Sequence, residues 1–418
     1  MFSFHLLYID PGTGSALFSI LIGAAATIYF LSRAIIIKLK VVLSGGKVSV
    51  NSKIVNSYVI YNEGKQYSNV FRPILAEFEK RNINLLYLTS SEDDPLLGKS
   101  YTFIKTEYIG EGNKAFSRLN MLNADIVLMT TPGLDVYQLK RSKGVKHYAH
   151  VLHAVSDATM YRLFGIDYYD SILLTGDYQA KDIRILEQKR GINAKQLVTV
   201  GCTYLDVYSE RIKELPAEEV HNFTVLVSPS WGASAILSRF GEKLLDPLME
   251  TGYKIIIRPH PQSKKSEFSI LEKLTEKYRN NKMIEWDYER ENIFSLSKAD
   301  IMISDYSGIV YDYAFLFSKP VLYIKQGFDM RPYDADDLDD AADTLWQFRT
   351  LKKIGIELKE EDFSKIDEII KNASDSEELR QAKKKASEEA WQYPGEASKR
   401  IADFLVNTRE IIINNNQN

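Results

Sequence analysis

Residues 301–325, IMISDYSGIVYDYAFLFSKPVLYIK, complete a strand–helix–strand unit. Short apolar runs at 299–303 and 321–324 predict two strands, and the apolar spacing over 309–316 predicts a helix between them. The turn at 304–308 places serine and glycine amides at the N-terminus of that helix. Free N–H groups and the positive end of the helix dipole favour a phosphate there. Taken alone, the unit is equally compatible with a purely structural turn.

The same alternation of short apolar strands and amphipathic helices continues on both sides of a polar linker at 210–221. Before the linker, strands are expected at 58–61, 84–88, 101–109, 125–130, 146–152, 171–175 and 196–200. After it, strands are expected at 223–227, 253–257 and 283–286, ahead of the unit quoted above. Strands that alternate with helices predict parallel sheets covered on both faces. The expected fold class is therefore α/β, with two doubly wound, Rossmann-like domains.

These segments divide the chain into four expected parts. They are an N-terminal transmembrane anchor at 1–43, a first Rossmann-like domain at 44–212, a second at 213–380, and C-terminal helices with a tail at 381–418. Within the second domain a single helix is expected at 236–251, and the acidic run at 334–343 is expected to be a solvated loop.

The N-terminal segment is apolar. Residues 16–32 carry no charge, and the apolar run resumes after Arg33 as far as Ile37. This length predicts a membrane-spanning helix, with a helix that lies in the membrane interface as the alternative. Basic side chains follow the segment, whereas no lysine or arginine precedes it. The positive-inside tendency therefore predicts a single-pass plasma-membrane protein with its N-terminus outside and both domains in the cytoplasm.

The bulk composition excludes some functions. The net charge is −3, so no basic surplus is available to neutralise nucleic-acid phosphates, and no nucleic-acid partner is expected. Cys202 is the only cysteine, which excludes an internal disulfide and a cysteine-based zinc site and fits a reducing compartment. The apolar neighbours of Cys202 predict a buried, inert thiol.

Polar side chains gather where the expected strands end. His153 follows the strand at 146–152; Ser230 and Trp231 follow 223–227; Arg258 and His260 follow 253–257; Asp305, Ser307 and Gly308 follow 299–303. Ligands of doubly wound domains bind beyond the carboxyl ends of the strands, in the cleft between the domains. We therefore expect these residues to converge on one cleft.

The histidines offer only a weak case for a metal. His150 and His153 are three positions apart, which is compatible with a metal pair, but no third ligand has matching spacing. The interpretation is that His150 is a residue within the strand at 146–152 and that His153 follows the end of this strand. No metal and no cofactor are expected.

Three motifs carry a resemblance to a known family. They are Ser228-Pro229-Ser230-Trp231, Arg258-Pro259-His260-Pro261, and SDYSGIVYDY at 304–313 with Lys319-Pro320 behind it. Together they resemble the CDP-glycerol glycerophosphotransferase family, which builds teichoic-acid-like polymers and has the two-domain GT-B fold. Leu152-His153-Ala154-Val155 stands where that family has Trp-His-Gly-Thr, and Gly308 replaces the second serine of its Asp-Tyr-Ser-Ser signature. The resemblance implies a divergent member.

The resemblance also implies a reaction. A membrane-anchored transferase would move a glycerophosphate-type (polyol-phosphate) group from a CDP-linked polyol donor to a hydroxyl of a lipid-linked cell-wall or capsule polymer. The acceptor hydroxyl would attack the distal phosphorus of the donor, with His153 as the general base. His260 and Arg258 would stabilise the charge that develops on the phosphates and the leaving group.

The remaining residues of the expected site belong to the donor. Ser307 and the Gly308 amide would bind the diphosphate at the helix N-terminus, and Asp312, one turn further on, would accept hydrogen bonds from ribose hydroxyls. Ser230, Trp231 and Asp305 complete the expected donor-binding set. For Asp312, an exposed helix residue without function is the alternative. Arg258 could equally hold a carboxylate in the domain core, and His153 and His260 could equally be ordinary polar residues without function.

Two other functional classes stay open. Residues 201–206 and 328–332, together with the same strand–helix–strand unit, also resemble UDP-N-acetylglucosamine 2-epimerases and GT-B glycosyltransferases that use nucleotide sugars. The altered motif around His153 is compatible with a catalytically degenerate, membrane-anchored binding protein. Preferential binding of a UDP-sugar over a CDP-alcohol would favour the nucleotide-sugar enzyme. Donor binding without any turnover would favour the binding protein.

Overall fold

The strand–helix–strand unit at 301–325 forms as expected. The computed structural model describes residues 55–415 apart from 217–221, 290, 326 and 328. In it, β11 (Ile301–Ser304) and β12 (Val321–Tyr323) pair in parallel, with Met302 opposite Val321, and α11 (Ile309–Leu316) connects them. Every residue of both strands is buried, which agrees with their uninterrupted apolar sequence.

The first domain is built on a seven-stranded sheet in the order β3-β2-β1-β4-β5-β6-β7, and all its pairings are parallel. Its strands are β1 (Asn56–Asn62), β2 (Leu85–Thr89), β3 (Ile104–Tyr108), β4 (Asn123–Met129), β5 (Gly144–Val151), β6 (Ser171–Leu174) and β7 (Gln196–Thr199). Its helices are α2 (Ser68–Lys80), α3 (Asn113–Leu119), α4 (Tyr178–Arg190) and α5 (Thr203–Lys213). The strand order reverses between β1 and β4, so this is a doubly wound sheet with its switch point at the end of β1.

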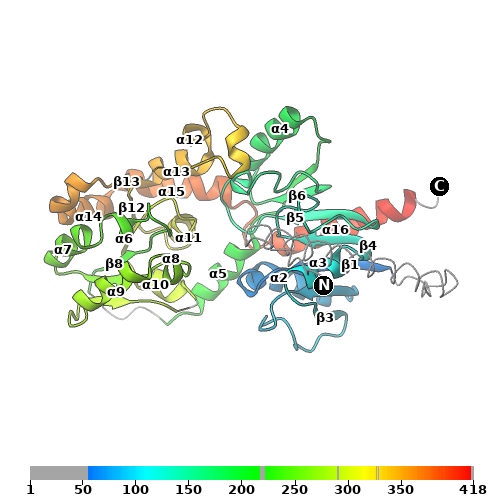
Figure 1. Cartoon of the computed structure of the whole chain (residues 1–418), viewed down its shortest axis with the longest axis horizontal. Helices are drawn as coiled ribbons and strands as arrows, with labels where there is room; N and C mark the ends of the chain where they lie inside the picture. Colours follow the sequence, from blue (N-terminus) through cyan, green and yellow to red (C-terminus); the bar gives the residue numbers. More distant parts are fainter. Residues whose placement is uncertain (1–54, 217–221, 290, 326, 328, 416–418) are drawn as a thin grey trace, which may run out of the picture. The chain divides into compact units, whose positions relative to one another are not determined.

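The second domain is built on a six-stranded parallel sheet in the order β10-β9-β8-β11-β12-β13. Its further strands are β8 (Thr224–Val227), β9 (Lys254–Ile257), β10 (Ile284–Trp286) and β13 (Gly355–Glu357). Its helices are α6 (Ile236–Arg239), α7 (Glu242–Glu250), α8 (Ser263–Ser266), α9 (Phe268–Lys277), α10 (Ile293–Lys298), α12 (Ala341–Thr344), α13 (Trp346–Ile354), α14 (Ile366–Asp375) and α15 (Glu377–Ala390). The predicted pair of parallel-sheet α/β domains is confirmed (Figure 1).

Both sheets are covered on both faces. Along β1, Tyr58 and Ile60 belong to one apolar cluster, whereas Val59 and Tyr61 belong to another. Residues of β8 alternate in the same way between two clusters of the second domain. Cys202 is fully buried in one of these clusters, so the prediction of a buried thiol is confirmed. Burial raises the pKa of the thiol to about 12, which disfavours the reactive thiolate.

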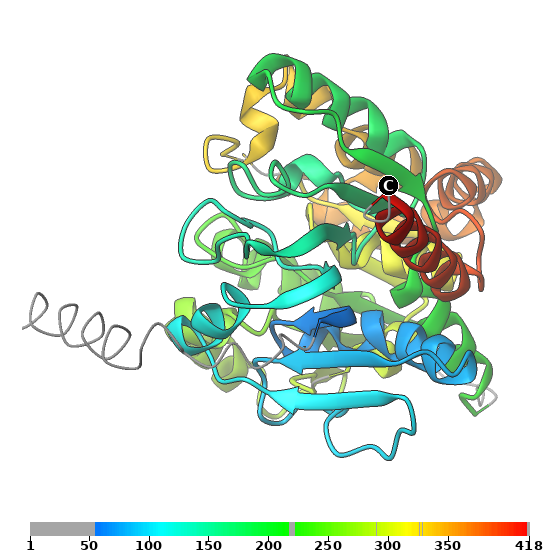
Figure 2. The same cartoon turned by 90° about the vertical axis from the view of Figure 1, so that its right-hand side faces the viewer.

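The last helix returns to the first domain. Helix α16 (Ala397–Asn415) places Ile401 and Leu405 in the same cluster as Ile60, and Arg409 donates a hydrogen bond to Asp125 of β4 at 2.9 Å. Figure 2 shows this helix, in dark red, beside the first domain. The core of the first domain therefore includes residues from the end of the sequence.

Two expectations within the second domain are wrong. The single helix expected at 236–251 is two helices, because the chain bends at Gly241, whose φ of 40° lies in the left-handed region that favours glycine. The acidic run is not a simple solvated loop, since Asp334 is fully buried against the first domain. Its carboxylate pairs with Arg190, a partner that lies 144 positions away in the sequence.

The membrane prediction falls outside the described residues. Residues 16–37, which the sequence predicts to span a membrane, belong to the part of the chain that the structure does not describe. Among the described residues, no helix is both long enough and apolar enough to cross a membrane.

Candidate active site

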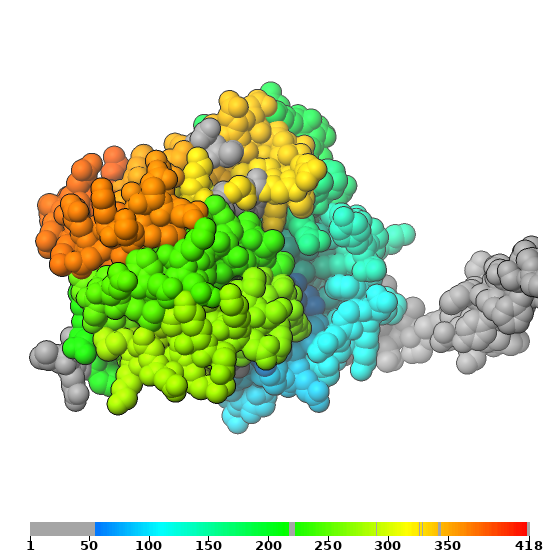
Figure 3. Space-filling view, turned by 60° about the vertical axis from the view of Figure 1, so that its left-hand side comes forward, coloured from blue at the N-terminus to red at the C-terminus, as the bar shows by residue number. Residues whose placement is uncertain are grey.

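A pocket of about 470 Å³ lies between the carboxyl ends of the two sheets. The second domain contributes Ser228, Arg258, His260, Glu291, Asn292 and Ser307; α5 contributes Tyr204 and Tyr208; the first domain contributes Lys65, Gln66, Ser68, Asn69 and Arg72. Figure 3 shows the boundary where the green surface of the second domain meets the blue and cyan surface of the first. Both switch points of the fold therefore face one pocket.

Asp305 connects the two turns that form the second-domain wall. These turns follow β8 and β11, which are neighbours in the sheet. The buried Asp305 carboxylate accepts hydrogen bonds from the Ser230 amide at 3.0 Å, the Ser230 hydroxyl at 2.8 Å and the Ser307 amide at 3.2 Å. Burial raises the pKa of Asp305, while these donors lower it. Asp305 therefore holds the turn in which Ser307 faces the pocket.

Replacing Asp305 by alanine is expected to lower the free energy of unfolding by about 1–3 kcal/mol, because the half-buried Ser230 and Ser307 lose the acceptor of their amides. Denaturant unfolding measures the change. The exposed Asp336 provides the control, since its replacement by alanine should leave stability within about 0.5 kcal/mol of the parent. An unchanged stability for Asp305→Ala would contradict the bracing role.

Arg258 and His260 follow β9 and face the pocket from the same wall. The Arg258 guanidinium forms an ion pair with Asp287 and donates to the Glu289 carbonyl at 2.8 Å, so it is fixed in position. The Nδ1 atom of His260 accepts a hydrogen bond from the Gln262 amide at 3.1 Å. A neutral imidazole with an accepting Nδ1 carries its proton on Nε2. Burial lowers the pKa of His260, which favours this neutral form.

Trp231 and Gly308 lie beside this wall and do not line the pocket. The half-exposed Trp231 ring lies 6.3 Å, between centroids, from that of His260. Gly308 is the N-cap residue of α11. Their donor-binding roles stay predictions.

His153 occupies a different cavity, of about 180 Å³, together with Asp157 and Tyr161. Its Nδ1 atom lies 2.9 Å from the Thr130 hydroxyl, and its ring centroid lies 4.8 Å from that of Tyr67. Burial lowers the pKa of His153 to about 4, so the imidazole is neutral at physiological pH. Tyr67 follows the pocket-lining Gln66, so His153 lies one side chain behind the pocket wall. Its role as general base stays a prediction.

Asp312 also lies behind the pocket. Burial raises the pKa of its carboxyl to about 7, and hydrogen bonding from Tyr204 lowers it. Tyr204 lines the pocket, and its ring stacks on that of Tyr208 at 4.4 Å between centroids. The predicted ribose contact of Asp312 remains untested.

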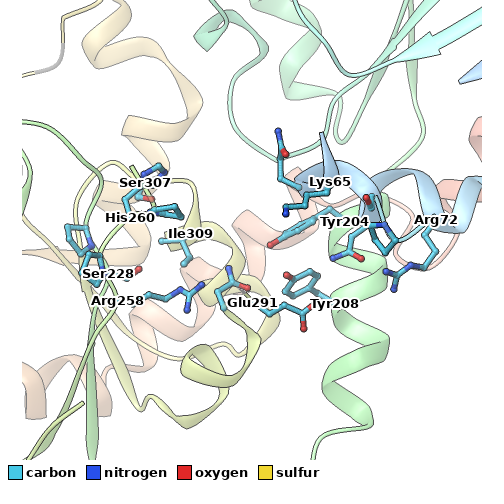
Figure 4. A pocket seen from close by; sticks show the side chains of 18 residues that line it. Lys65, Arg72, Tyr204, Tyr208, Ser228, Arg258, His260, Glu291, Ser307 and Ile309 are labelled. Atoms are coloured by element: carbon cyan, nitrogen blue, oxygen red, sulfur yellow. The ribbon is translucent and has the colours of Figure 1, made fainter. Parts of the chain in front are cut away.

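Sequence reasoning missed the first-domain wall and the two tyrosines of α5. Lys65 and Arg72 follow β1, at the switch point of the first sheet, and the strand-end rule could have indicated them. Figure 4 shows Arg258, His260 and Ser307 on one side of the pocket and Lys65 and Arg72 on the other, with Tyr204 and Tyr208 between them.

Histidine and acidic side chains do not form a metal site in the described part of the chain, where no group of three or more candidate ligands comes together. His150 is fully buried between the rings of Tyr161 and Tyr169, and burial lowers its pKa to about 3. This environment fits a neutral core histidine.

Two parallel-sheet domains with polar residues at both switch points define a GT-B-like fold, a class in which ligands bind in the cleft between the domains. The sequence model of the CDP-Glycerol:Poly(glycerophosphate) glycerophosphotransferase family matches residues 47–407. The chain therefore belongs to this family and is an enzyme of the CDP-glycerol glycerophosphotransferase type, as its motifs predicted. No curated protein sequence matches it.

Solved structures show the same fold at low sequence identity. A variant of the wall teichoic acid polymerase TagF is 14% identical with a TM-score of 0.54, covering 86% of this chain and 90% of its own. The UDP-GlcNAc 2-epimerase of Methanocaldococcus jannaschii, in complex with UDP-GlcNAc and UDP, is 14% identical with a TM-score of 0.54, covering 84% and 99%. The α,α-trehalose 6-phosphate synthase of Burkholderia multivorans is 9% identical with a TM-score of 0.52, covering 87% and 98%.

Proposed function

We propose that this protein transfers a glycerophosphate-type group from CDP-glycerol to a hydroxyl of a lipid-linked cell-wall or capsule polymer at the cytoplasmic face of the membrane. The observation that carries the proposal is the pocket, in which Arg258, His260 and Ser307 face the basic side chains of the first domain. Membership of the family supports the donor, and a TagF structure soaked with CDPG has the same fold.

The second-domain wall fits the donor diphosphate. The positive charge of Arg258, the Nε2–H of His260 and the Ser307 side chain provide charge and hydrogen-bond donors for phosphate oxygens. In the transfer, a bond forms between the acceptor oxygen and the distal phosphorus. The bond from that phosphorus to the bridging oxygen breaks, so CMP leaves with the negative charge. The fixed donors of this wall stabilise that charge without rearranging.

The acceptor hydroxyl must lose a proton in the same reaction. His153 is the proposed base, because burial keeps its imidazole in the neutral form that a base requires. Its position behind Tyr67 requires the wall to move when substrates bind. Hydrogen bonds of catalytic groups are often long or absent before the substrate complex forms.

We infer membrane attachment from the N-terminal sequence. The apolar segment at 16–37 and the basic residues after it support an anchor with the domains on the cytoplasmic side. Such an anchor would keep the pocket near a lipid-linked acceptor.

Calorimetric binding of nucleotides to the full chain in detergent tests the donor. We expect CDP-glycerol to bind at least about tenfold more tightly than UDP-GlcNAc, a difference of about 1.4 kcal/mol. CMP, the expected product, should compete with CDP-glycerol. Preference for UDP-GlcNAc would instead support a UDP-sugar enzyme, a reading that the similar 2-epimerase fold favours. Binding without any transfer would support a binding protein.

A further inference from the structure

Arg72 is a cation on the pocket wall that has no hydrogen-bond or ion-pair partner among the described residues. It lies on α2, on the first-domain side of the pocket, and is partly buried. Its guanidinium makes no hydrogen bond or ion pair with any residue that the structure describes, and its Nε atom is buried without an acceptor. The neighbouring Lys65, by contrast, forms an ion pair with Asp93. Because Arg72 also lines the pocket, an anion bound in the pocket can reach the guanidinium and is its natural partner.

The wall that carries Arg72 is rigid. The buried Asp94 accepts hydrogen bonds from the Ser68 hydroxyl at 2.9 Å, the Asn62 amide at 2.9 Å and the Tyr87 hydroxyl at 2.7 Å. Ser68 is the first residue of α2, and Pro95, next to Asp94, also lines the pocket. This network fixes the start of the helix against the sheet, so the backbone that carries Arg72 is in position before any ligand arrives.

The charges around the pocket leave Arg72 uncompensated. Among the described residues, Glu291 is the only carboxylate that lines the pocket, and it pairs with Arg211. On the first-domain side, Tyr101 lies close enough to interact with Arg72, but it is a neutral phenol at physiological pH, and burial raises its pKa further. The first-domain wall is therefore cationic.

We propose that Arg72 binds a phosphate of the acceptor chain, and so selects acceptors that already carry a phosphodiester near the attacking hydroxyl. This inference rests on the proposed function. The donor diphosphate has its own residues on the opposite wall, beyond Tyr204 and Tyr208 (Figure 4). A planar guanidinium binds a phosphate through two parallel hydrogen bonds, which a neutral polyol cannot offer.

Steady-state kinetics of the full chain in detergent test this with two synthetic acceptors, a lipid-linked glycerol phosphate and the same lipid ending in glycerol without phosphate. For Arg72→Gln we expect the KM of the phosphorylated acceptor to rise about tenfold or more, with kcat within about threefold. The KM of the neutral acceptor should stay unchanged. Arg72→Lys should recover part of the loss, because it restores the charge without the planar fork.

The control is Lys80→Gln, which removes one positive charge from the exposed end of the same helix and should change neither KM. Thermal unfolding of each variant excludes a folding defect. Three outcomes overturn the inference: weaker CDP-glycerol binding by Arg72→Gln, an equal loss with both acceptors, or no loss with either. Absence of transfer from CDP-glycerol by the parent chain overturns the proposed function, and this inference with it, before any variant is compared.

Discussion

Replacing His260 by alanine is expected to lower the rate of glycerophosphate transfer by about 100- to 1000-fold. The Gln262 amide occupies Nδ1 and thereby leaves the proton on Nε2, in the pocket that also contains Ser307. A donor fixed in this way interacts most strongly with the charge that develops on the phosphates and on CMP in the transition state. Its loss should therefore reduce kcat far more than it weakens CDP-glycerol binding. Single-turnover transfer and calorimetry measure the two effects separately.

The pH dependence provides an independent check on His260. Burial lowers its pKa below the usual value near 6.5, so the imidazole is neutral at pH 7. Protonation would remove the acceptor of the Gln262 amide hydrogen bond, and we therefore expect activity to be constant above pH 7 and to fall only at acid pH. His260→Asn, which keeps a side-chain N–H donor, should retain more activity than His260→Ala. Equal activity of His260→Ala and the parent would remove His260 from the mechanism.

Most of the fold could be predicted because nearly all of its parallel strands are marked locally. The exception is the edge strand β13, Gly355–Glu357, which is only three residues long and was not predicted. Strand β11 was predicted from the apolar run at 299–303. A strand that is buried on both faces has a continuous apolar sequence, so it can be recognised without knowing which strands it pairs with. The break between α6 and α7 was not predicted, because Gly241 lies within otherwise regular apolar spacing. A glycine inside a helical pattern does not by itself show whether the helix ends there.

The second-domain wall of the site was easier to predict than the first-domain wall. Arg258, His260 and Ser307 stand directly at strand ends, so the fold places them together by its topology. Arg72 lies ten residues beyond the end of β1, within α2, and its lack of a partner among the described residues becomes visible only in three dimensions. His153 also stands at a strand end, but the packing of Tyr67 against its ring places it in a separate cavity.

Arg190 is expected to be the largest single contributor to stability among the ion pairs between the domains. Its guanidinium is 9% exposed and lies 2.7 Å from the carboxylates of Asp167, which is 4% exposed, and of Asp334, which is fully buried. Replacing Arg190 by methionine leaves both carboxylates without their cation and should lower the free energy of unfolding by about 3–5 kcal/mol. Denaturant unfolding measures this change. The control is Lys189→Met, which breaks an exposed pair with Asp339 and should cost at most about 1 kcal/mol.

The cost of Arg190→Met should depend on pH in a defined direction. Burial already raises the pKa of Asp334 to about 6, and Arg190 opposes that rise. Without Arg190 the pKa of Asp334 must rise further, so this carboxyl is neutral in the folded variant over a wider range of pH. A raised folded-state pKa disfavours folding only at a pH where the carboxyl is ionised in the parent. The unfolding free energies of variant and parent should therefore be closest near pH 5 and furthest apart near pH 7.5. The opposite outcome is a gap between the unfolding free energies of parent and variant that is the same at both pH values. It would show that Arg190 does not control the ionisation of Asp334. The apolar contacts of the acidic segment would then hold that segment against the first domain instead.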